Sequence, residues 1–201
     1  MSPLLRLVQQ QVQQLQEYSD LAEIEEIARR YFAMNAFDGV LTIVGVLTGN
    51  YMAGVDQPTV VISTGLSTCV AMGVSGLWGA YLTEAAERKR ALDDLEDHTL
   101  TDLSETRIGR ASRAAVVVVA LVDGLAPFLA ALVVLIPFFV LPSAMDIAIS
   151  YYVSLGLALA TLFGLGAFLG HISRGHLVVY GLKMCAAGLI AILLSVLLGK
   201  V

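Results

Sequence analysis

Two aspartates that lie within long apolar stretches, Asp38 and Asp123, are the strongest candidates for a chemical function in this sequence. Each is followed directly by a glycine. A carboxylate in hydrocarbon costs at least about 2.5 kcal/mol, so it needs a partner or a water-filled cavity. The structural interpretation is an ion pair with Lys183 or a cap on neighbouring backbone. We favour cation handling for Asp38, and both interpretations stay open for Asp123.

Small and polar residues recur around Asp38 at helical spacing. Asn35, Asp38, Thr42, Gly45 and Gly49 follow one another at steps of three and four residues and form one stripe. Such a stripe on a membrane helix faces protein or a pore rather than lipid. Asn35 and Thr42 are therefore secondary candidates for the same site.

The second apolar stretch offers a matching set of ligands. Met72, Gly76, Ala80, Glu84 and Glu87 share one helix face, and the glycine leaves space beside Met72. A thioether beside carboxylates suits a transition metal better than Ca²⁺ or Mg²⁺, which prefer oxygen ligands alone. The alternative, that Met72 only fills space in the core as methionine usually does, stays open.

Glu84 and Glu87 begin a charged segment and are the predicted first ligands for a metal that arrives from solution. Basic residues alternate with the acids of this segment, so ion pairs on a solvated helix explain most of it. His171 corresponds to Glu84 in the internal repeat described below, which makes it a secondary candidate, as Lys183 is. Cys69, by contrast, is predicted to pack in the core.

Helices that cross a membrane must position these residues. The sequence is 57% hydrophobic and 14% charged, whereas an ordinary soluble domain is about half apolar and about a quarter charged. Five apolar blocks are each long enough to cross a hydrocarbon layer of about 30 Å as a helix: 33–55, 59–82, 113–140, 146–170 and 176–198. We predict an all-α polytopic membrane protein, which excludes a soluble enzyme, a nucleic-acid-binding module and a disordered chain. Since no catalytic motif is present, we predict neither enzymatic activity nor a bound cofactor.

Lysines and arginines indicate the orientation in the membrane. They cluster before the first block and between the second and third, and Arg174 lies between the fourth and fifth. The links 54–58 and 141–145 contain none. By the positive-inside rule, the N-terminus is cytoplasmic and the C-terminus lies outside.

The residues before the first block predict further helices. Leu4, Val8, Val12 and Leu15 recur at helical spacing between glutamines, which is typical of an amphipathic helix for a membrane surface or a partner helix. The predicted divisions are N-terminal cytoplasmic helices, a first pair of spans, a charged helical link, a second pair of spans and a last span: 1–30, 31–82, 83–112, 113–170 and 171–201.

The two pairs of spans resemble each other. Asp38-Gly39 recurs as Asp123-Gly124, 85 positions later, and Gly79-Ala80-Tyr81-Leu82 recurs as Gly166-Ala167-Phe168-Leu169, 87 positions later. Both halves run in the same direction in the predicted orientation. We therefore predict a parallel two-helix repeat with the fifth helix as an addition, and transporters commonly place their sites where repeats meet.

Prolines and glycines predict the bends and contacts of this framework. Pro127 and Pro137 both fall in the third block, so that helix is predicted to be kinked or broken. Glycines that permit close helix packing recur in the fourth block at Gly156, Gly164, Gly166 and Gly170.

The sequence resembles the vacuolar iron transporter family. The resemblance rests on Asp38-Gly39-Val40-Leu41-Thr42 in the first span and on Gly79-Ala80-Tyr81-Leu82-Thr83 leading into Glu84-Ala85-Ala86-Glu87-Arg88. The five helices, the charged link and the apolar last helix agree with it. This chain has Gly79-Ala80-Tyr81 where the family usually has Gly-Glu-Tyr, and its link is shorter than the glutamate-rich cytoplasmic domain of the better-known members.

The resemblance implies a homodimeric exchanger in a prokaryotic cell membrane, which moves Fe²⁺ or Mn²⁺ out of the cytosol against protons. It maps the first-helix aspartate of the family onto Asp38. It also implies that Met72, Glu84 and Glu87 line the path of the metal ion. The implied partners are the lipid bilayer, the metal ion and a second copy of the chain, with no nucleic acid. A second hypothesis is a non-transporting scaffold or lipid-interacting protein that kept the fold, which Ala80 in place of a carboxylate favours.

Overall fold

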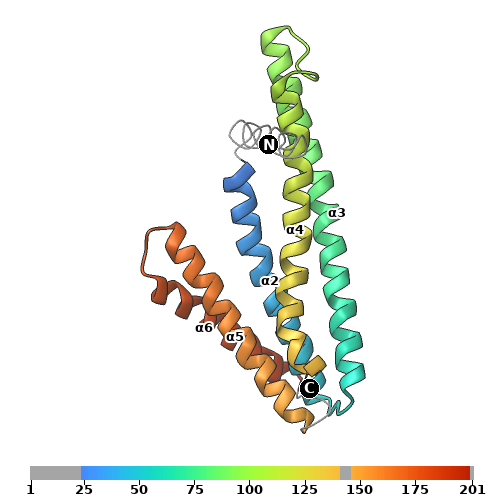
Figure 1. Cartoon of the computed structure of the whole chain (residues 1–201), viewed down its shortest axis with the longest axis vertical. Helices are drawn as coiled ribbons and strands as arrows, with labels where there is room; N and C mark the ends of the chain where they lie inside the picture. The colour runs from blue at the N-terminus through green and yellow to red at the C-terminus, as the bar shows by residue number, and fades with distance from the viewer. Residues whose placement is uncertain (1–23, 141–145, 200–201) are drawn as a thin grey trace, which may run out of the picture. The chain divides into compact units, whose positions relative to one another are not determined.

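The computed structural model describes residues 24–140 and 146–199, whose regular structure is entirely helical. Five helices among these residues are long and apolar enough to cross a membrane. They are α2 (Ile24–Met52), α3 (Pro58–Thr99), α4 (Arg107–Val140), α5 (Ile147–Ile172) and α6 (Leu177–Leu198) (Figure 1). The predicted all-α membrane fold with five spans is confirmed. The amphipathic helix predicted before the first span lies outside the described residues.

Two helices extend well beyond the apolar blocks that marked them in the sequence. The 42 residues of α3 are about twice the ~20 that a membrane-spanning helix needs. α4 begins at Arg107, several residues before the third apolar block. The charged segment is therefore helical mostly as the continuation of α3 and α4, with a turn over residues 100–106 between them.

The chain divides into two compact units, and the division falls within helices. The first, which we call the hairpin unit, comprises residues 24–31 and Ser75–Gly124, and so holds the charged ends of α3 and α4. The second, which we call the bundle unit, comprises Phe32–Val74 and residues 125–199.

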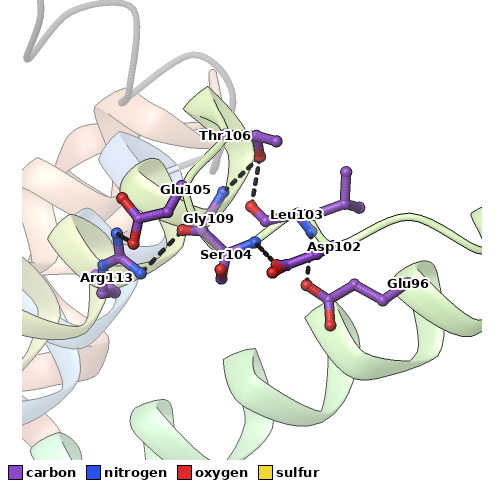
Figure 2. A network of polar contacts seen from close by, with 8 residues as sticks. All are labelled: Glu96, Asp102, Leu103, Ser104, Glu105, Thr106, Gly109 and Arg113. Atoms are coloured by element: carbon purple, nitrogen blue, oxygen red, sulfur yellow. Dashed lines mark hydrogen bonds and ion pairs between the residues drawn. The ribbon is translucent and has the colours of Figure 1, made fainter.

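Polar contacts fix the turn of the hairpin unit (Figure 2). The backbone N–H of Leu103 donates to the carboxylate of Glu96 over 2.7 Å. The backbone N–H of Ser104 donates to Asp102 over 2.8 Å. Hydrogen bonds from Ser104 to its carboxylate hold the pKa of Asp102 below the ordinary aspartate value. The two carboxylates thus accept from backbone N–H groups of the turn, which lie outside both helices and have no intrahelical partners.

Apolar side chains from four helices form the core of the bundle unit. Its fully buried members include Val40, Ile43 and Leu47 of α2, Cys69 of α3, Leu135 and Phe138 of α4, and Tyr151 and Leu162 of α5. The hydroxyl of Tyr151 donates to the backbone carbonyl of Val55 over 3.0 Å, which satisfies the polar end of a buried ring. The burial of Cys69 confirms its predicted packing role.

Glycines set the close contact between α5 and α6. A Cβ atom on Gly166 would lie 2.7 Å from the Cα of Gly181, and one on Gly170 would lie 3.0 Å from the Cα of Leu177. These two glycines confirm the predicted small-residue packing of the fourth span. Gly156 and Gly164 face open space instead, so they take no part in that contact.

The two prolines of α4 do not break the helix. α4 is continuous from Arg107 to Val140 and includes both Pro127 and Pro137, so of the predicted kink or break, the break does not occur. Within the bundle unit, Pro127 lies against Gly39 of α2, where a Cβ would come within 2.6 Å of the proline Cα. The absence of a side chain at Gly39 is what lets the two helices approach so closely at this level.

Candidate metal site

Asp38 lies on a face of α2 that the described residues leave exposed. Its side chain is exposed, as is that of Thr42, and Cβ atoms on Gly45 and Gly49 would meet nothing within 4 Å. The opposite face of α2 is buried in the core of the bundle unit. The predicted polar and small stripe is thus the outward face of a helix whose composition suits a membrane.

Lys183 has a partner other than an aspartate. Its ammonium group lies 5.3 Å from the ring centroid of Tyr180, three residues earlier on α6. Within residues 24–140 and 146–199, no ion pair joins Lys183 to Asp38. The structural alternative for Asp38, neutralisation by this lysine, is therefore not realised in the described part of the chain.

Met72 packs against the core of the bundle unit. Its side chain is half-buried beside the core cluster, which is the ordinary position of a methionine that fills space. Because the side chain is only partly buried, a role as a ligand and a role in packing both stay open for Met72.

Glu84 belongs to a small polar cluster in the hairpin unit. The hydroxyl of Tyr31 donates to its Oε1 over 3.3 Å, and Nε of Arg88 donates to its Oε2 over 3.1 Å. Only 15% of the Glu84 side chain is exposed. Glu87, one turn further along α3, is exposed, so the two predicted first ligands have different surroundings although they share a helix face.

Asp123 is buried, with only 8% of the residue exposed. A Cβ atom on Gly76 would lie 2.8 Å from its backbone oxygen and 3.1 Å from its Oδ2. Gly76 therefore makes room for Asp123 and the backbone of α4, whereas the sequence suggested that it makes room for Met72.

Tyr31 is the residue of this cluster that the sequence did not single out. It precedes the first apolar block, next to Arg29 and Arg30, and so is typical of an aromatic residue at a membrane interface. Tyr31 and Glu84 are 53 positions apart in the sequence, and a local sequence pattern does not predict a contact over such a separation.

The secondary candidates do not join a common site. Asn35 is half-buried, Thr42 is exposed, and His171 is exposed near the end of α5. Among the residues that the structure describes, no group of three or more His, Cys, Asp and Glu side chains could hold a metal ion. The predicted ligands therefore do not form a common metal site within the described residues.

Replacing Tyr31 by Phe is expected to destabilise the protein by about 1 kcal/mol, because a partly buried hydrogen bond to a carboxylate is lost. Tyr81→Phe, in the same unit, is the matched control because Tyr81 is 44% exposed. Thermal unfolding of both variants in the same detergent measures the difference. An equal shift in the two variants would contradict the contribution assigned to the contact between Tyr31 and Glu84.

Comparison with known proteins places these features in a family. The sequence model described as the VIT family matches residues 93–200. An uncharacterized protein of Methanocaldococcus jannaschii is 30% identical over 178 residues, which cover 87% of this chain and 90% of that protein. No solved structure matches the chain.

Proposed function

Because the chain belongs to the VIT family of membrane metal-ion transporters, we propose that it carries Fe²⁺ or Mn²⁺ out of the cytosol in exchange for protons. The exposed carboxylate of Asp38, on a helix apolar enough to cross a membrane, is the observation that carries this proposal. A carboxylate binds a divalent cation when ionised. In this proposal the carboxylate exchanges the cation for a proton.

The uncovered stripe of α2 supports a homodimer. A carboxylate that faced lipid would be costly, and the stripe from Asp38 to Gly49 is polar and small rather than strongly apolar. Gly45 and Gly49 have open space beside them, so another helix could approach closely. In this proposal a second copy of the chain covers the stripe, and the cation passes along the face that includes Asp38 and Thr42.

The remaining candidates have lesser roles in this proposal. Glu87, exposed on α3, is the first ligand for a cation that arrives from the cytosol, and Glu84 follows with its carboxylate held by Tyr31 and Arg88. Met72 adds a soft ligand that favours transition metals. Asp123 and His171 correspond to Asp38 and Glu84 in the proposed repeat, and they are the equivalent candidates in the second half.

The orientation and membrane are part of the same proposal. The basic residues of the hairpin unit support a cytoplasmic location for the extended ends of α3 and α4, together with the N-terminus. The C-terminus then lies outside. The membrane is the cell membrane of a prokaryote.

One observation favours a second function, that of a non-transporting scaffold that retains the family fold. Ala80 is buried, with 6% of the residue exposed, at the position where the family pattern usually has a glutamate. A buried methyl group there provides no ligand for a cation. A scaffold of this kind would bind neither Fe²⁺ nor Mn²⁺ in a saturable manner.

Flux through purified protein in neutral-lipid vesicles distinguishes the two functions. A metal-sensitive dye and a pH-sensitive dye inside the vesicles report cation uptake and proton release in the same experiment. We expect saturable movement of Fe²⁺ or Mn²⁺ that is accompanied by protons, with Ca²⁺ excluded by the soft ligand. Flux equal to that of protein-free vesicles, together with no saturable binding by calorimetry, would establish the scaffold instead.

A further inference from the structure

A cavity of about 430 Å³ lies between α3 and α4 in the hairpin unit. The side chains of Arg88, Lys89 and Arg113 line it together with apolar residues, and no Asp or Glu lines it among residues 24–140 and 146–199. The cavity thus combines a concentration of positive charge with apolar walls. Transport of a cation does not explain a lining in which every charged side chain is basic.

Two of the three cations, Arg113 and Arg88, are held in place by polar contacts. Arg113 donates to the backbone carbonyl of Ser104 over 2.9 Å and forms an ion pair of 3.8 Å with Glu105 (Figure 2), yet 57% of its side chain stays exposed. Glu84 occupies only Nε of Arg88, and a guanidinium has five N–H donors. Lys89 is exposed. An anion in the cavity would meet donors that the hairpin has already oriented.

One end of the cavity lies toward the membrane-spanning parts of the two helices and is apolar. Val116 and Val117 of α4 line it, as does Tyr81 of α3. Tyr81 lies beside Trp78, with ring centroids 6.3 Å apart, and 61% of Trp78 is exposed. Exposed Trp and Tyr side chains concentrate at the level of lipid headgroups. The cavity therefore begins at the interface and extends from it into the charged region.

We propose that this cavity binds an anionic phospholipid. The headgroup phosphate lies among Lys89, Arg113 and Arg88, and the upper part of an acyl chain lies along Val116 and Val117. Basic pockets between helices at a membrane surface bind anionic headgroups in this way. A soluble anion would use the cations but leave the apolar walls in contact with water, which is why a lipid fits the whole lining better. This inference does not depend on metal transport.

Native mass spectrometry in a neutral detergent tests the proposal. Phosphatidylglycerol and phosphatidylcholine with identical acyl chains are added in turn to the wild type and to Lys89→Gln/Arg113→Gln. The matched control is Arg90→Gln/Arg110→Gln, which removes the same charge from the same two helices at exposed positions outside the cavity. Val117→Trp, a third variant, fills the cavity and keeps every charge.

We expect the wild type and the control to retain phosphatidylglycerol in preference to phosphatidylcholine. Each cation near an anionic headgroup contributes about fivefold, so Lys89→Gln/Arg113→Gln should bind phosphatidylglycerol about 25-fold more weakly. Val117→Trp should also lose the preference, although its net charge is unchanged. Intact thermal unfolding in the control and in at least one cavity variant establishes that the comparison is between folded proteins.

Several outcomes would overturn the proposal. Equal retention of the two lipids by the wild type would exclude an anionic-lipid site. Equal losses of phosphatidylglycerol binding in the cavity and control variants would show that only the overall charge of the protein matters. Complete displacement by inorganic phosphate would identify the ligand as a soluble anion. A change of oligomeric state in the cavity variants, with lipid binding unaltered, would assign the cavity to contact with a second copy.

Discussion

Asp38→Asn is expected to reduce metal flux by at least about 30-fold. In the proposed dimer the carboxylate and its cation are covered, and loss of one partner from such a desolvated charge pair costs about 2 kcal/mol or more. Asparagine keeps the size and shape of the side chain. It removes the negative charge that attracts a divalent cation, and its amide does not take up a proton in exchange. Both the metal signal and the proton signal should therefore disappear together in vesicles that contain this variant.

Asp56→Asn provides the matched control for that experiment. Asp56 is an exposed aspartate in the link between α2 and α3, outside both helices, so the same substitution changes the same charge away from the span. Its flux should equal that of the wild type. Undiminished flux in Asp38→Asn, at equal amounts of folded protein in the vesicles, would remove Asp38 from the transport mechanism.

Gly39→Ala should destabilise the bundle unit by about 1–3 kcal/mol, the usual cost of forcing an extra carbon into a packed contact. The added Cβ would lie 2.5 Å from the backbone oxygen of Pro127 and 2.6 Å from its Cα. Backbone atoms of a helix cannot move aside as the end of a flexible side chain can. The helices would have to separate at this level, which would disturb the core residues on either side.

A glycine-to-alanine substitution at Gly164, also in the bundle unit, is expected to stabilise the protein rather than destabilise it. A Cβ atom on Gly164 of α5 would meet nothing within 4 Å, so Gly164→Ala should stabilise by up to about 1 kcal/mol through the better helix propensity of alanine. Thermal unfolding in one detergent compares the two variants directly. If both variants move the unfolding temperature in the same direction, the close contact between Gly39 and Pro127 does not limit the packing of α2 against α4.

Hydropathy predicts the five spans because each apolar block has the length and composition of a membrane helix. It does not predict where the helices end. The second apolar block ends at residue 82, yet α3 continues to Thr99. Helix formation in its charged continuation depends on good helix formers and on pairs such as Glu84 with Arg88, four residues apart. These features stabilise a helix without raising its hydropathy.

The two aspartates show what the sequence could not provide about the site. Asp38 and Asp123 have the same local pattern, a carboxylate before a glycine, and are natural counterparts in the predicted repeat. The structure leaves Asp38 exposed and buries Asp123. Helical periodicity indicates which residues share a face, but the neighbour that covers that face is fixed by tertiary packing. The contact of Asp123 with Gly76 is an example.

Pro127 is a second residue whose surroundings the local sequence does not predict. A proline inside a helix removes one backbone hydrogen bond, which makes a kink or a break the natural expectation. α4 nevertheless continues through it. Pro127 is buried against Gly39, and this tight helix contact is not visible in either local sequence. Partners contributed by distant segments therefore decide both the shape of α4 and the surroundings of the site.

The position of Trp78 gives the protein an intrinsic optical probe. It is the single tryptophan of the chain, and it lies beside Tyr81 at the edge of the cavity. All of the indole fluorescence therefore originates from this one place. Its emission wavelength and its quenching by brominated lipids would report the polarity and depth of the helix surface there, without any label or any change to the sequence.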